Sequence, residues 1–181
     1  MTEELKPANR FQETFGLPVE GARTKVRTFM EEHVVDFIRR SPFAVLATSD
    51  AQGHCDASPR GGTPGFVRVL DERRLLLPDV AGNRLFQTYG NVDDNGHVGL
   101  LFFIPGNERT VRVNGRARPI TESEVEALQA ELSVYWHDDN TRLLQGLLID
   151  VDEAYGHCPR ALKFSKLWDV ETIENNRLQE Q

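Results

Sequence analysis

The sequence predicts a mainly β protein, an antiparallel barrel with helices at its flanks. Short apolar or alternating segments of strand length follow one another along most of the chain. Tight turns separate them, and few helical patterns come between. A doubly wound parallel sheet would need a helical crossover between nearly every pair of strands, so that fold is excluded. With 181 residues the chain is long enough for one domain with a substantial core.

A helix is predicted over residues 22–40, where Val26, Phe29, Met30, Val34 and Phe37 recur at helical spacing and Ser41-Pro42 ends the pattern. Seven strands are expected, at residues 43–50, 54–60, 66–71, 73–79, 97–106, 110–120 and 143–158. A short helix should begin at Asn83. A second should begin after Thr121, which forms a capping box with Glu124. The barrel domain then spans residues 22–170, between an N-terminal arm (1–21) and a polar tail (171–181).

Composition restricts the partners. The net charge of −7 and the pI near 5.3 argue against a nucleic-acid partner held by general electrostatics. No apolar run approaches the roughly 20 residues of a membrane span. The N-terminal residues lack the basic and apolar regions of a signal peptide, and two cysteines are too few for a disulfide scaffold. We therefore expect a cytoplasmic protein.

Metal and nucleophile chemistry find little support in the sequence. The dipeptides His54-Cys55 and His157-Cys158 together have the four ligands of a zinc site. Adjacent residues of a strand point to opposite faces, however, so neither pair can readily share one ion. No base is placed beside either cysteine, and the paired aspartates occur where turns favour them. We assign no metal site and no catalytic residue.

An anion site is better supported. The apolar run 75–77 ends in Pro78-Asp79 and a small-residue turn, and Asn83-Arg84 then opens the predicted helix. A positive side chain opposes the dipole at a helix N-terminus unless an anion binds there. Further arginines lie on or beside predicted strands, and their convergence at one end of a barrel would make a local phosphate or carboxylate site. The arginines of this set are Arg60, Arg68, Arg84, Arg112 and Arg116.

Four segments in this order resemble the pyridoxamine 5'-phosphate oxidase-like flavoproteins, which are FMN-binding split β-barrels. They are SPFAVLATSDAQGHCDASPRGG, LLLPDVAGNRLFQTYGNV, HVGLLFFIPG and RTVRVNGRARPI, and the resemblance covers about residues 25–170. The late segment CPRALKFSKLWD resembles the end of one bacterial subgroup of FMN-dependent oxidase-type proteins. The resemblance implies a homodimeric, FMN-dependent oxidoreductase with its flavin sites between subunits.

The resemblance also implies roles for individual residues. Asn83 and Arg84 match the residues that hold the FMN phosphate, and Arg68 matches a basic residue that reaches it from the preceding strand. The backbone of residues 63–67, including Phe66 and Val67, would run along the isoalloxazine ring, where glycines allow the close approach of a flat ligand. The remaining matches are Pro78 and Asp79 beside the ribityl chain, and Thr110, a polar flavin contact that usually comes from the second subunit.

Two departures from the family leave the chemistry open. The usual Arg-Lys phosphate pair is Asn-Arg here, and the basic block that grips pyridoxal phosphate is not recognisable, since Arg160, Lys163 and Lys166 are spaced differently. FMN binding is therefore better supported than activity on pyridoxamine phosphate. The family also contains deazaflavin-dependent reductases and haem-binding or haem-degrading members. A non-catalytic flavin or haem carrier stays an alternative, with His54 or His157 as candidate axial ligand.

Overall fold

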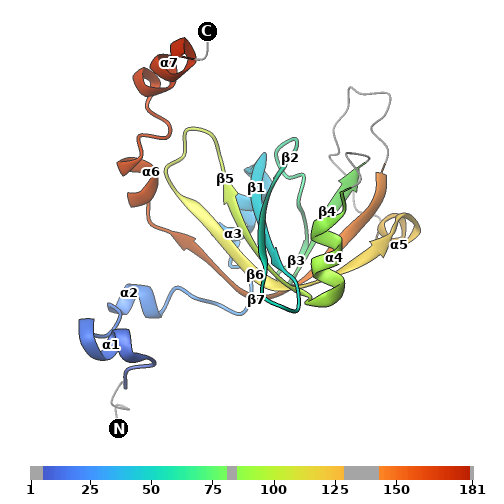
Figure 1. Ribbon diagram of the computed structural model, residues 1–181, viewed down its shortest axis with the longest axis horizontal. Helices are drawn as coiled ribbons and strands as arrows, with labels where there is room; N and C mark the ends of the chain where they lie inside the picture. The colour runs from blue at the N-terminus through green and yellow to red at the C-terminus, as the bar shows by residue number, and fades with distance from the viewer. Residues whose placement is uncertain (1–5, 81–84, 129–142, 180–181) are drawn as a thin grey trace.

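A computed structural model describes residues 6–80, 85–128 and 143–179 of the chain. Its centre is a single antiparallel sheet of seven strands in the order β2-β1-β5-β6-β7-β4-β3. The strands are β1 (Phe43–Ser49), β2 (Cys55–Gly61), β3 (Arg68–Asp71), β4 (Arg74–Val80), β5 (His97–Phe103), β6 (Thr110–Thr121) and β7 (Leu143–His157). The sheet curls into a barrel that stays open between its edge strands β2 and β3 (Figure 1). The predicted fold class, a split barrel with flanking helices, is confirmed, although the sheet does not close.

Alternation along the strands separates an inner face from an outer face. Inward side chains such as Leu46, Leu100, Phe102, Val113 and Ile149 are almost fully buried and form one continuous core. At neighbouring positions the outward side chains are partly or fully exposed. A sequence that alternates in this way can bury only one face of each strand, and curling the sheet buries all those faces together.

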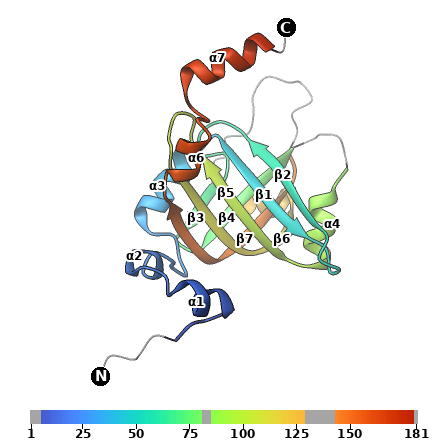
Figure 2. The ribbon, with the colours of Figure 1, turned by 60° about the vertical axis from the view of Figure 1, so that its left-hand side comes forward.

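The outer face has a covered part and an uncovered part. Helix α5 (Glu122–Ala127) packs Val125 against Leu76, Ile120 and Leu148 of β4, β6 and β7, which makes a second small core. Thr121 caps this helix, and the predicted capping box with Glu124 is present. No described helix crosses the outer face of β1, β2 and β5 in Figure 2, and the outward side chains of β1 and β5 are partly or fully exposed.

The helix predicted over residues 22–40 is wrong in its first half. Helix α2 (Glu20–Arg23) ends early, residues 24–31 are irregular apart from an isolated bridge at Arg27, and only α3 (Glu32–Arg40) continues the apolar stripe into the core. Arg27 exchanges both backbone hydrogen bonds with Ala154, at 2.8 and 3.3 Å. The part of β7 beyond Asp150 has no partner in β4, so pairing with this segment satisfies an edge that helix formation would leave bare.

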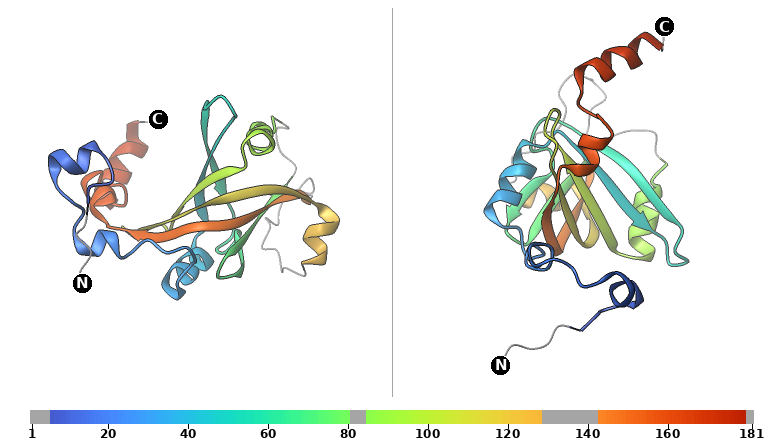
Figure 3. Two further views of the ribbon diagram at one scale, coloured as in Figure 1. Left: turned by 90° about the horizontal axis from the view of Figure 1, so that it is seen from below. Right: turned by 90° about the vertical axis from the view of Figure 1, so that its left-hand side faces the viewer.

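The terminal segments extend from the barrel. Helices α1 (Arg10–Phe15) and α7 (Val170–Gln179) bury no residue, and both stand away from the sheet (Figure 3). A short helix, α6 (Arg160–Phe164), lies between β7 and α7 in the chain. Trp168 fixes this C-terminal segment, because its indole Nε1 donates a 2.9 Å hydrogen bond to the Asn107 carbonyl.

Candidate functional site

Helix α4 (Gln87–Asp94) lies across the opening of the barrel, between β2 and β4 (Figure 1). Polar side chains attach it to the strands. Arg60 of β2 donates a 2.8 Å hydrogen bond from Nη2 to the Thr88 hydroxyl, and Asn91 donates to Thr48 and Asp56. These bonds attach α4 to β1 and β2, on one side of the split.

The helix begins later than the sequence predicts. Its N-cap is Phe86, in the left-handed region at φ 50°, and its first residue is Gln87. The predicted helix start at Asn83 is therefore wrong by four positions, and α4 gives the argument from the helix dipole no support. Asn83 and Arg84 themselves lie outside the described residues, and their proposed contact with a phosphate rests on the resemblance.

The edge formed by β3 and β4 gathers several predicted flavin contacts. Arg68 pairs with Leu76 across the two strands, and Pro78 is the next residue of β4 on that outer face. Diagonal neighbours of this kind lie roughly 7–8 Å apart. Among the described residues, no carboxylate pairs with the half-buried Arg68 guanidinium. A cation therefore stands beside the strand that leads into the predicted phosphate-binding turn.

Phe66 and Val67 lead directly into Arg68 and have buried side chains, 4% and 1% exposed. A ligand at this edge could therefore meet their backbone but not their side chains. Gly65 has φ 81°, and a Cβ there would lie 2.9 Å from the Arg39 carbonyl oxygen. Close packing against the end of α3 therefore requires this glycine, and that requirement is independent of any flat ligand.

Asp79 differs from its neighbour Pro78 because it points to the inner side of the barrel mouth. Burial raises the pKa of its carboxyl group, and interactions with Gln145, Arg60 and Tyr89 partly oppose that shift. Burial and the nearby Asp79 charge raise the pKa of the Tyr89 phenol in turn. These contacts tie β4 to α4 and β7, so Asp79 supports the site from inside the barrel.

Thr110 lies far from this edge within one chain. It pairs with His157 at the end of β7, whereas Pro78 pairs with Gly146. The two positions on β7 are eleven residue steps apart, which corresponds to about 36 Å of strand. Figure 3 shows β6 and β7 crossing the width of the barrel. One FMN cannot reach both ends, so a single chain does not assemble the whole predicted set.

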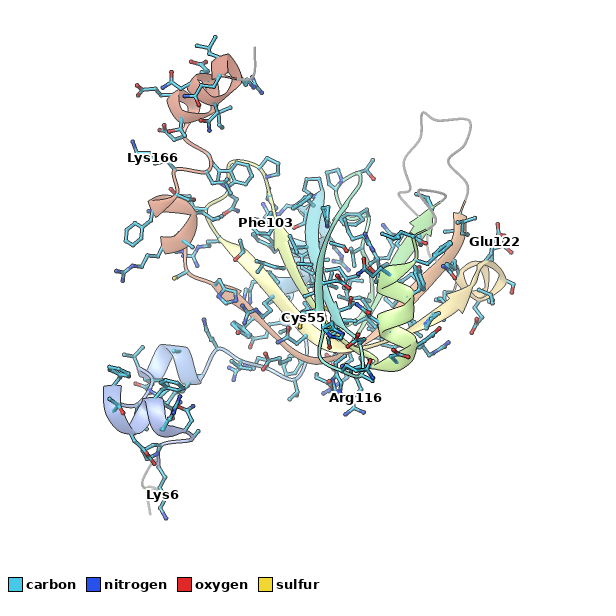
Figure 4. The ribbon with its side chains drawn as sticks, viewed as in Figure 1. Lys6, Cys55, Phe103, Arg116, Glu122 and Lys166 are labelled. Atoms are coloured by element: carbon cyan, nitrogen blue, oxygen red, sulfur yellow. The ribbon has the colours of Figure 1, made fainter. Side chains whose placement is uncertain are left out.

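The four described arginines of this set do not converge at one end, contrary to expectation, and Arg84 lies outside the described residues. Arg60 faces inward toward α4, Arg68 lies on the outer face at the opposite edge, and Arg112 bonds Tyr155 at the far end of β6. Arg116 points away from the sheet (Figure 4) and lies 3.8 Å from the Asp152 carboxylate. Sheet register decides these positions, and register cannot be read from one strand alone.

A second polar cluster surrounds Thr110, and sequence reasoning missed it as a group. Arg112 donates a 3.0 Å hydrogen bond to the Tyr155 hydroxyl, Lys25 lies 4.7 Å above the Tyr155 ring, and the His157 ring is 4.9 Å away. The buried His157 Nε2 has no hydrogen-bond partner in the described structure. Alternation could have placed Arg112, Tyr155 and His157 on one face, but Lys25 comes from the irregular segment that sequence reasoning had made helical.

The paired His-Cys dipeptides do not form a metal site. Cys55 and Cys158 are exposed, and His54 lies in the β1–β2 turn, 2.7 Å from Asp50. Among the described residues, no three His, Cys, Asp or Glu side chains are grouped as metal ligands. No described helix has the length and apolar character needed to cross a membrane.

Comparison with known proteins decides the family. The model of the pyridoxamine 5'-phosphate oxidase family matches residues 30–158, most of the chain. The chain belongs to the pyridoxamine 5'-phosphate oxidase family. No curated protein matches the sequence.

Solved structures of this family's fold are similar to the chain. A putative pyridoxamine 5'-phosphate oxidase from Lactobacillus delbrueckii is 18% identical, with a TM-score of 0.54 over 73% of this chain and 99% of its own. HupZ from Group A Streptococcus is 22% identical, with a TM-score of 0.52 over 70% of this chain and 93% of its own. At these identities the likeness shows the fold alone.

Proposed function

We propose that the protein is an FMN-dependent oxidoreductase that works as a homodimer, with each flavin bound between two copies. The observation that carries the proposal is the edge formed by β3 and β4. There the Arg68 cation, which pairs with no carboxylate of the described residues, lies beside Pro78 and follows a backbone whose side chains are turned into the core. A phosphate-bearing, flat cofactor needs this combination of a charged contact and exposed backbone.

Each residue would have a binding role. Arg68 would hold the phosphate, with Asn83 and Arg84 as the resemblance implies, and the backbone of Phe66 and Val67 would face the ring. The bound flavin would supply hydride or electron transfer. Asp79 would act indirectly, by fixing β4 against α4 through its contacts with Tyr89 and Gln145.

The second copy enters because Thr110 is too far away to join the same flavin within one chain. The open outer face of β1 and β5 supports this arrangement. Val45, Leu101 and Phe103 point outward there, and the Phe43 and Phe103 rings lie 5.9 Å apart. A twofold pair formed on this face would bury these apolar side chains.

Flavin titration tests the cofactor assignment. Quenching of flavin fluorescence should show that FMN binds more tightly than riboflavin, and Arg68→Gln should weaken FMN binding about tenfold to a hundredfold. Riboflavin, which has no phosphate, should bind both proteins alike. Arg74→Gln is the matched control, because Arg74 follows on β4 and pairs with Asp71 at 2.8 Å. Equal affinities for the two flavins would refute the phosphate site, and tighter binding of a deazaflavin would change the cofactor.

Haem is the second candidate, favoured by the unpartnered His157 Nε2 beside two cations. A neutral imidazole can ligate iron, and cations can pair with haem propionates. Haemin added to the purified protein would then give a Soret band that His157→Gln abolishes. His54→Gln is the control, since the His54 side chain is 83% exposed and lies in a turn. A Soret band unchanged by His157→Gln would remove this candidate.

A further inference from the structure

We propose that Lys25, Arg112 and His157 bind the anionic group of the substrate, which makes the substrate an organic carboxylate or phosphate. The inference rests on the proposed flavin site, because Thr110 places this cluster beside the flavin. We call Lys25, Arg112, Tyr155 and His157 the β6–β7 cluster.

The cluster is built from three separate segments. Arg112 and Tyr155 pair directly across β6 and β7, as do Thr110 and His157 one step along. Side chains of such cross-strand pairs share one face, about 5 Å apart, and successive pairs on that face are separated by about 7 Å. Lys25 reaches them from the segment that pairs with the edge of β7, and its Nζ lies 3.5 Å from the Gly156 carbonyl.

The two cations of the cluster have no acidic partner among the described side chains. Glu153 is the nearest carboxylate along this face of β7, and it already accepts a 2.6 Å hydrogen bond from Asn114. Asp152, the next one, lies 3.8 Å from Arg116. Lys25 and Arg112 both approach the Tyr155 ring, at 4.7 and 5.7 Å from its centroid, and both charges act on His157. A bound anion would compensate this positive charge.

His157 adds an unsatisfied polar atom to the same place. Its buried Nε2 lacks a hydrogen-bond partner in the described structure. Burial, Arg112 and Lys25 all lower the pKa of its imidazole, so the ring stays neutral at pH 7. A neutral imidazole carries one N–H, and an anionic oxygen is an acceptor for it. Because a buried polar atom without a partner is costly, the site is better explained as one that a ligand completes.

The cluster lies where a substrate would meet the flavin. The family resemblance places Thr110 against the cofactor, and Thr110 is the cross-strand neighbour of His157. Arg112 follows two residues later on the same face. A substrate held by Arg112 and Lys25 would therefore lie within about 7 Å of the flavin contact. We infer that these residues select the substrate by its charge, and they are binding residues with no role in proton transfer.

Calorimetry with simple anions tests the inference in the full chain, both FMN-saturated and without FMN. The probes are benzoate, inorganic phosphate and the neutral benzamide. We expect benzoate or phosphate to bind and benzamide not to bind. Whichever of the two anions binds more tightly shows whether the site is adapted to a carboxylate or to a phosphoryl group. Arg112→Gln and Lys25→Gln should each weaken that anion about tenfold or more.

Arg116→Gln is the matched control, because it removes an exposed cation from the same strand and should leave anion binding unchanged. Thermal unfolding checks that each variant folds. If Arg112→Gln does not fold, Lys25→Gln still tests the inference, because Lys25 lies outside the barrel strands. Unchanged anion binding in both variants, or benzamide binding as tightly as benzoate, would overturn the inference.

FMN affinity, measured in the same samples, separates this inference from the proposed function. Normal FMN binding without any anion binding would refute the anion site and leave the flavin site standing. Arg112-dependent anion binding in a protein that does not bind FMN would refute the flavin site, and with it the assignment of the anion as a substrate group.

Discussion

The side-chain amide of Asn91, on α4, donates a 2.7 Å hydrogen bond to the Asp56 carboxylate on β2. Its second N–H reaches the Thr48 hydroxyl on β1 at 3.0 Å. Asn91 is only 8% exposed, so one amide satisfies two polar groups at a buried contact. The contact joins the helix that covers the split to the two strands beside it, so hydrogen bonds fix α4 together with the apolar burial of Val92.

Asn91→Ala should therefore lower the free energy of unfolding by about 2–3 kcal/mol, because Asp56 and Thr48 lose their donor in a buried place. Urea unfolding followed by circular dichroism measures this loss. Gln87→Ala is the control, since Gln87 donates to the same carboxylate at 3.0 Å from an exposed position. We expect that change to cost less than about 1 kcal/mol. Equal losses would show that burial of Asn91 is unimportant.

The strands were predictable because each carries its own pattern. Residues 43–49 and 110–121 alternate or run apolar between turns, and their predicted bounds agree closely with β1 and β6. The capping box at Thr121 was equally local. Features of this kind depend on residues a few positions apart, so one sequence suffices to find them.

The errors arose where distant segments meet. The helical pattern of residues 22–40 was overridden from 24 to 31, because Arg27 satisfies the free edge of β7. Arg60 and Arg112 were expected together, and sheet register puts them on opposite faces. The β6–β7 cluster depends on Lys25, which only that unexpected pairing brings to Tyr155. Local patterns carry none of this information.

Asp79→Asn should stabilise the protein increasingly, relative to wild type, as the pH rises. Burial raises the pKa of Asp79 above its ordinary value of 3.8, so the unfolded chain releases this proton more readily. The contribution of Asp79 to stability is therefore greatest below pH 3.8 and is lost as the pH rises through the folded-state pKa. Urea unfolding of both proteins between about pH 4 and pH 8 measures this dependence. The free energy of unfolding of the wild-type protein, relative to that of the variant, should be highest at the acid end. The variant should then gain stability relative to wild type toward the alkaline end.

Asp71→Asn supplies a control of opposite sign. Burial would raise the pKa of Asp71, but hydrogen bonds from the Arg73 backbone and the Arg74 side chain outweigh it and lower the pKa. Asp71 therefore stabilises the fold above pH 3.8, and this contribution is lost as the pH falls through the folded-state pKa. The variant should be less stable than wild type near pH 7. Parallel pH dependence in the two variants would contradict the different environments of the two carboxylates.

The pKa of His157 should rise when either neighbouring cation is removed. Burial lowers this pKa first, and the charges of Arg112 and Lys25 lower it further. Arg112→Gln and Lys25→Gln each leave the burial and remove one charge, so both should shift the titration of the His157 ring protons, followed by NMR, toward higher pH. Arg116→Gln should leave the curve in place. An unchanged His157 pKa in both variants would show that the two cations lie farther from the ring than the structure has them.

Leu101→Lys should separate the proposed homodimer. Leu101 points outward from β5 between Val45 and Arg112, on the open face of the sheet. A buried leucine contributes about 1.5–3 kcal/mol, and a twofold interface contains each position twice. The change should therefore weaken dimerisation at least about a hundredfold, measured by sedimentation equilibrium. Leu178→Lys, on α7 and 70% exposed, is the control and should leave the dimer intact.

FMN binding by the separated chains completes the test. Pro78 and Thr110 pair with two positions of β7 that are eleven residues apart. A monomer therefore presents only part of the proposed site to any one flavin. Leu101→Lys should consequently bind FMN more weakly than wild type, although it alters neither Arg68 nor Thr110. Raising the protein concentration until the variant dimerises should restore the affinity, because the lost contacts come from the second copy. A monomer that binds FMN stoichiometrically with wild-type affinity would show that one chain holds the whole site, and Thr110 would then have no part in it.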